Sequence, residues 1–85
     1  MIILNQDKDE IINFDNTASI YLVDEWDDKP GIVIKADNIH GSVSTLGYYK
    51  NSDRAKEVLQ NIINWYAGDA MVEYNGFIYY EMPKE

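Results

Sequence analysis

One stretch of this 85-residue chain carries apolar residues at helical spacing, and it constrains the fold more than any other feature. Apolar residues recur there every three or four positions, which is the period of one helix face: Ala55, Val58, Leu59, Ile62, Ile63 and Tyr66. Asn51 or Ser52 can cap the start, and Gly68 stands where a glycine commonly ends a helix. The spacing therefore predicts one helix over residues 52–67.

The remaining apolar residues form short runs that are typical of β-strands. Five such runs precede the helix, separated by polar turns: 2–5, 10–14, 18–24, 31–36 and 42–50. In the fifth run the apolar positions change parity between Val43 and Leu46, which predicts a bulge near Gly47. After the helix, Asn75-Gly76 interrupts an alternating run and predicts a tight hairpin. We expect a single α+β domain over 1–85: an antiparallel meander of about five strands, the helix packed on it, and a C-terminal hairpin.

Charge and composition narrow the classes of function. The formal net charge is -8, so phosphate neutralisation over a broad face, which drives nucleic-acid binding, is not expected. The chain has no cysteine, which excludes disulfides and thiolate metal sites. No run reaches membrane-spanning length, and the first residues lack the basic region of a signal peptide. These features predict a cytoplasmic protein that binds neither nucleic acid nor a membrane.

Catalytic and metal-binding motifs are missing from the sequence. There is no Gly-x-Ser-x-Gly, no phosphate-binding loop and no His-x-x-x-His pair. The only histidine, His40, lies in the turn-like stretch DNIHG and has no second nitrogen or sulfur ligand to share a zinc ion. We therefore expect no enzyme activity, no metal and no cofactor.

The stretch GYYKNSDRAKEV contains the strongest candidate for a binding site. A bulged strand end leads into the first helical turn, whose free N–H groups and dipole favour anions. Arg54, the only arginine, lies in that turn, where a cation is unfavourable unless something anionic binds. The candidate ligand-binding residues are Tyr48, Tyr49, Lys50, Asn51, Ser52 and Arg54. The alternative is that nearby carboxylates pair with the cations and that the tyrosines pack on the sheet.

The stretch DEWDDKPG, residues 24–31, sets acidic side chains around a tryptophan. Counted from Asp24, Lys29 and Lys35 occupy the positions where a calcium loop needs glycine and glutamate, so the EF-hand pattern fails. A solvated hairpin loop is the simplest interpretation. A tryptophan at a loop tip can also anchor an interface. The alternative protein-interface residues are Asp24, Glu25, Trp26, Asp27 and Asp28.

The assembly state is also predicted from composition. Seven tyrosines and two tryptophans are many for a chain of this length. Adjacent pairs such as Tyr79 and Tyr80 face opposite sides of a strand, so some rings must lie at a surface or interface. A domain this small gains stability from association, and we expect a homo-oligomer, most simply a dimer.

Three stretches resemble a group of small uncharacterised proteins from phages and prophages of Gram-positive bacteria: MIILNQDKDEIINFDN, LGYYKNSDRAKEVLQNII and YYEMPKE. The resemblance covers most of the chain and implies a phage accessory protein that opposes host defence inside the infected cell. One hypothesis is that the protein sequesters an anionic nucleotide-type immune signal. A second is an acidic inhibitor that binds a host defence nuclease, as anti-CRISPR proteins do. A minor structural phage protein is a third.

Overall fold

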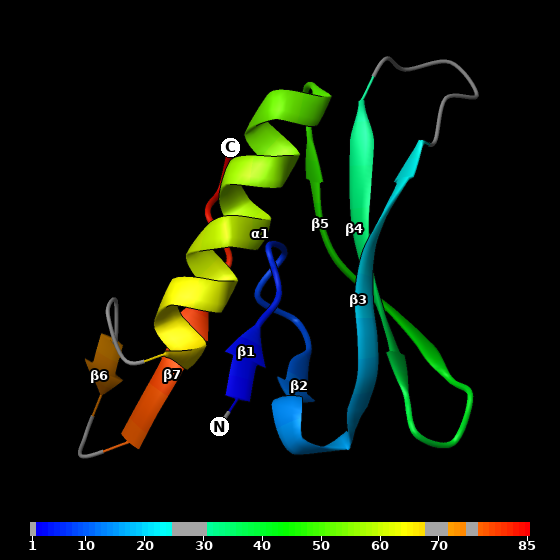
Figure 1. The fold of residues 1–85 in the computed structure, drawn as a ribbon. Helices are drawn as coiled ribbons and strands as arrows, with labels where there is room; N and C mark the ends of the chain where they lie inside the picture. The colour runs from blue at the N-terminus through cyan, green and yellow to red at the C-terminus, as the bar shows by residue number, and fades with distance from the viewer. Residues whose placement is uncertain (1, 25–30, 68–71, 75–76) are drawn as a thin grey trace.

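The computed structural model describes residues 2–24, 31–67, 72–74 and 77–85. These residues form seven strands, one short 3-10 helix and one α-helix (Figure 1). Their order along the chain is β1 (Ile2–Leu4), β2 (Ile11–Asn13), η1 (Phe14–Asn16), β3 (Thr17–Asp24), β4 (Ile32–Asn38), β5 (Val43–Tyr49), α1 (Ser52–Tyr66), β6 (Val72–Tyr74) and β7 (Phe77–Glu81). The α+β class with one helix is confirmed. No helix of the described residues is long and apolar enough to cross a membrane.

The helix α1 begins and ends close to the predicted positions. Asn51 caps it, because its side-chain oxygen accepts a hydrogen bond from the N–H of Arg54 at 2.8 Å. The buried side of α1 is a stripe made by Ala55, Val58, Ile62 and Trp65. Leu59, Ile63 and Tyr66 form a second apolar stripe beside it. Leu59 is half-buried, while Ile63 and Tyr66 are each 55% exposed, so the apolar arc of α1 is wider than the core requires.

The strands form two sheets, which differs from the predicted single meander. Strands β3, β4 and β5 form a three-stranded antiparallel sheet in that order. The second sheet has the order β2-β1-β7-β6, and β1 pairs with β7 in parallel (Figure 1). The two N-terminal runs therefore join the C-terminal strands rather than the meander. The antiparallel pairing of β6 with β7 agrees with the expected hairpin, whose turn at Asn75-Gly76 lies outside the described residues.

Strand β5 contains the bulge that the parity change predicts. Ile34 pairs with Gly47 and the next residue, Lys35, pairs with Thr45, so Leu46 is the extra residue. The bulge allows Leu46 and Gly47 to be buried side by side. A Cβ on Gly47 would lie 2.9 Å from the Tyr49 ring, so this position needs glycine.

The core lies where α1 meets both sheets. Its fully buried members include Ile3 from β1, Ile34 from β4, Leu46 from β5 and Trp65 from α1. The Trp65 ring contacts Phe14 edge-on, with ring centroids 5.9 Å apart, and it also packs on Tyr80 at 5.6 Å. One helix therefore closes the two sheets over a shared apolar interior.

Candidate functional site

A hollow of roughly 430 Å³ opens at the end of β5 and the start of α1. It contains four of the candidate ligand-binding residues together with two residues from the C-terminal segment: Tyr48, Tyr49, Lys50, Arg54, Lys84 and Glu85. Three of its side chains are basic, in a chain that has only seven lysines and arginines. No sequence pattern indicates that Lys84 and Glu85 join this site, because their approach depends on the path of the chain after β7. We call this feature the cationic hollow.

The Arg54 side chain at the cationic hollow is bonded to the main chain of Glu85 and to the carboxylate of Glu57. Its Nε and Nη2 donate to the main-chain oxygen of Glu85 at 2.9 and 2.8 Å. Its Nη1 pairs with the carboxylate of Glu57, one turn along the helix. The guanidinium also lies 6.0 Å from the centre of the Tyr49 ring, within cation–π distance. Arg54 thus has a structural role, because it holds the C-terminal segment. Its ion pair with Glu57 also agrees with the alternative interpretation, in which nearby carboxylates pair with the cations.

The two tyrosines of the candidate site point to opposite faces of β5. Tyr49 is 1% exposed, and its hydroxyl donates to the main-chain oxygen of Pro83 at 2.7 Å. Tyr48 is half-buried on the other face, where its ring lies over Gly31: a Cβ there would come within 2.4 Å of the ring. Because adjacent strand residues alternate, the two rings cannot clasp a ligand together. Only Tyr48 has ring surface to offer a flat ligand.

Burial raises the pKa of the Tyr49 phenol well above its ordinary value, and it also raises the pKa of Tyr80. A phenol whose pKa is raised in the folded state stabilises the fold below its unfolded pKa of about 10, and that stability is lost as pH rises further. We therefore expect the free energy of unfolding to fall steeply above about pH 10. Denaturant melts between pH 8 and pH 11 test this. Tyr49→Phe should flatten the slope, whereas an unchanged slope in both Tyr49→Phe and Tyr80→Phe would contradict the prediction.

The other candidate residues lie on the rim of the cationic hollow or beside it. Lys50 is exposed and belongs to the lining. Asn51 is committed to capping α1, and Ser52 is exposed at its first turn. Lys50 and Lys84 form no ion pair within the described residues, so they are the cations that an incoming anion would meet first.

Gln6 is a site residue that sequence reasoning missed. Its side-chain amide oxygen accepts from the N–H of Tyr48 at 2.8 Å, and its Nε2 lies 3.0 Å from the Tyr48 main-chain oxygen. The same nitrogen reaches the main-chain oxygens of Pro83 and Lys84 at 3.2 and 2.8 Å. Gln6 therefore ties β5 to the C-terminal segment and positions Tyr48 and Lys84, which line the cationic hollow. A glutamine in a polar turn gives no sequence signal of such a role.

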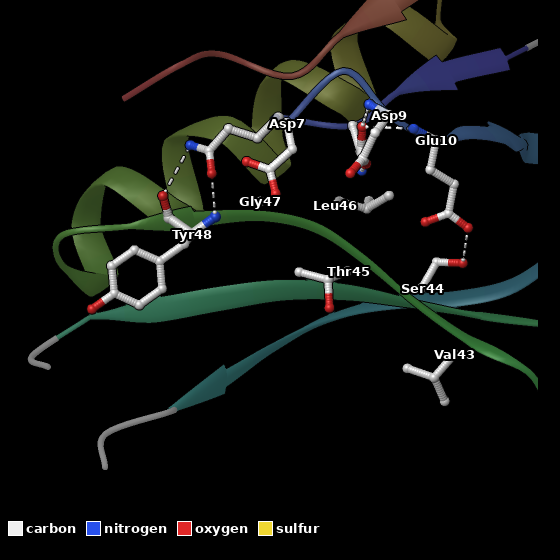
Figure 2. A pocket seen from close by; sticks show the side chains of 11 residues that line it. Asp7, Asp9, Glu10, Val43, Ser44, Thr45, Leu46, Gly47 and Tyr48 are labelled. Atoms are coloured by element: carbon white, nitrogen blue, oxygen red, sulfur yellow. Dashed lines mark hydrogen bonds between the residues drawn. The ribbon is translucent and has the colours of Figure 1, made fainter. Parts of the chain in front are cut away.

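An acidic hollow of roughly 360 Å³, whose lining includes Gln6, lies between the β1–β2 turn and β5 (Figure 2). Figure 2 shows Asp7, Asp9 and Glu10 above the strand, with Glu10 accepting a hydrogen bond from the Ser44 hydroxyl at 3.0 Å. Asp9 is held by the Asn5 side chain at 2.8 Å. Within the described part of the chain, no group of three histidine, cysteine or carboxylate side chains is arranged to hold a metal ion.

The remaining predicted residues lie elsewhere. His40 is exposed in the β4–β5 turn, where its N–H donates to the Asn38 side chain. Asp24 is exposed at the end of β3. Glu25, Trp26, Asp27 and Asp28 lie outside the described residues.

Comparison with protein-family models, with curated proteins and with solved structures finds no match for this chain.

Proposed function

We propose that this chain is a non-enzymatic binding protein that sequesters a small anionic ligand of nucleotide type in the cationic hollow. The observation that carries the proposal is the gathering of Lys50, Arg54 and Lys84 around one depression of a chain whose net charge is -8. Elsewhere the acidic surface repels anions, so a local positive field is needed for one to bind. A phage counter-defence role, with the ligand an immune signal, is the setting in which such sequestration would act.

Each part of the hollow offers a distinct contact. Phosphate oxygens would be met by the ammonium groups of Lys50 and Lys84, which form charge-assisted hydrogen bonds. Arg54 uses at least three of its five N–H donors on Glu85 and Glu57. It therefore contributes positive electrostatic potential and at most two free N–H donors to a ligand. The Tyr48 ring offers a face for a base, since aromatic stacking tolerates any base. Tyr49 supports the site from within the core.

The lysine pair gives a cleaner test than Arg54, because Arg54 also docks the C-terminal segment. Purified protein is incubated with mononucleotides, cyclic dinucleotides and ADP-ribose derivatives while its melting temperature is followed. A ligand at a hundredfold excess over its dissociation constant should add about 2.7 kcal/mol, which corresponds to about 11–22 °C for a domain of this size. The double variant Lys50→Ala/Lys84→Ala should lose most of that shift and keep the melting temperature of the unliganded protein.

A matched control removes two exposed lysines outside the hollow, Lys8→Ala/Lys56→Ala, and lowers the net charge equally. It should retain binding. Loss of the ligand shift in this control as well would assign binding to net charge rather than to the hollow. The absence of a shift with every nucleotide would refute the proposal.

The acidic hollow supports a second candidate function, inhibition of a basic partner protein. Asp7, Asp9 and Glu10 form a carboxylate surface that a nucleic-acid groove of a defence nuclease would complement. The test is whether the protein blocks DNA binding by such a nuclease, with Asp7→Asn/Asp9→Asn as the weakened variant. Inhibition that survives this substitution would place the contact elsewhere.

A further inference from the structure

The two edge strands of the three-stranded sheet differ in whether another segment covers them. The free edge of β5 is covered by the β1–β2 turn: Gln6 N–H donates to the Leu46 oxygen at 2.8 Å, and the Gln6 side chain bonds the main chain of Tyr48. The opposite edge belongs to β3, which at eight residues is the longest strand among the described residues. Among the described residues, only β4 forms ladder hydrogen bonds with β3.

Strand β3 has one irregularity in its pairing, between Thr17 and Ser19, and its regular part from Ser19 to Asp24 lacks the features that usually protect an edge. Natural edge strands carry lysine, proline or inward-pointing charges, which prevent pairing with another chain. The β3 sequence, TASIYLVD, contains no lysine or proline, and its one charge is Asp24 at the last position. None of the described residues occupies this edge from Ser19 to Asp24, so the main chain there can pair with a further strand.

The inner face of β3 is also only partly covered. Helix α1 packs on β4 and β5, so Ile20 and Leu22 on β3 stay half-buried at the margin of the core. A groove of roughly 440 Å³ runs between Ile20 and the second apolar stripe of α1. None of the described residues that line it is charged, although the chain has 22 charged residues. The exposed Ile63 and Tyr66 form its outer wall.

We infer that the occupant of this groove is a second copy of the chain, with β3 paired antiparallel to β3 of its partner about a two-fold axis. An axis perpendicular to the sheet joins the two three-stranded sheets into one and places both helices on the same face. The second apolar stripes, Leu59, Ile63 and Tyr66, then meet across the axis and fill both grooves. A charge-free patch is where two chains of net charge -8 can meet with least repulsion. An isologous contact of this kind closes as a dimer.

The test is the mass in solution, measured by sedimentation equilibrium over a range of concentrations. We expect twice the protomer mass of 9.8 kDa. Ile63→Glu should weaken the dimer by about tenfold or more, since it places like charges at the axis. Val43→Glu is the matched control, because Val43 is 57% exposed, similar to Ile63, and lies on β5 at the opposite edge of the sheet, outside the groove. This control should leave the dimer intact.

Hydrogen exchange distinguishes pairing through β3 from another contact. The β3 amides that do not bond β4 should be protected in the dimer and should lose that protection on dilution and in Ile63→Glu. A monomer at high concentration would overturn the inference. So would a dimer that is equally sensitive to both substitutions, or one in which β3 amides exchange freely.

Discussion

Replacing Trp65 with alanine should destabilise the protein by about 3–5 kcal/mol, the range found when a large buried aromatic is removed. Trp65 is fully buried, and it contacts Phe14 from η1 and Tyr80 from β7, so its ring joins α1 to both ends of the chain. A small domain is held by only about 5–15 kcal/mol, and the loss is therefore a large share of the total. Urea denaturation followed by circular dichroism measures it.

Trp65→Phe is the informative companion to this substitution. The indole Nε1 is buried without a hydrogen-bond partner among the described residues, which is an uncompensated desolvation cost. Phenylalanine removes that unsatisfied donor along with part of the ring volume. We expect Trp65→Phe to cost clearly less than Trp65→Ala. Equal losses from the two variants would show that the indole N–H has a partner that stabilises it.

Replacing Gln6 with alanine should cost about 1.5–4.5 kcal/mol, from some three hydrogen bonds worth about 0.5–1.5 kcal/mol each. The Gln6 side-chain amide makes the pair of hydrogen bonds that the main chain of a neighbouring strand would make, since it accepts from the Tyr48 N–H and donates to the Tyr48 main-chain oxygen. It also holds the C-terminal segment through Pro83 and Lys84. Its loss should therefore loosen residues 83–85 and lower the affinity for any ligand that contacts Lys84.

Gln6→Glu separates the two roles of Gln6. It preserves the acceptor for the Tyr48 N–H and replaces the donor with an oxygen that repels the main-chain oxygens of Tyr48, Pro83 and Lys84. The variant should remain folded, but the Met82 amide, which donates to the Leu4 oxygen at 3.0 Å at the start of this segment, should exchange faster with solvent. An unchanged Met82 exchange rate in Gln6→Glu would show that Tyr49 and Arg54 hold the segment without Gln6.

Local patterns in the sequence determined the local elements. Helical spacing and an asparagine cap specify α1, and the structure agrees to within one residue at its C-terminal end. The change of parity before Gly47 specifies the bulge in β5, because a bulge shifts which residues face the core. Both features depend on neighbours a few positions apart in the chain. A single sequence carries that information directly.

Long-range pairing decided what the sequence could not. The parallel pairing of β1 with β7 joins residues almost a chain length apart and removes the N-terminal strands from the meander. The candidate site shows the same division. The sequence predicted Tyr48, Lys50 and Arg54 at one place, but Lys84 and Glu85 reach it only through tertiary contacts, including the one with Gln6. Alternation placed Tyr49 in the core because its face of β5 is the one that α1 covers. Local spacing determines which faces of a helix or strand are apolar. The packing of distant elements decides which of those faces are buried and which remain exposed to a ligand or partner.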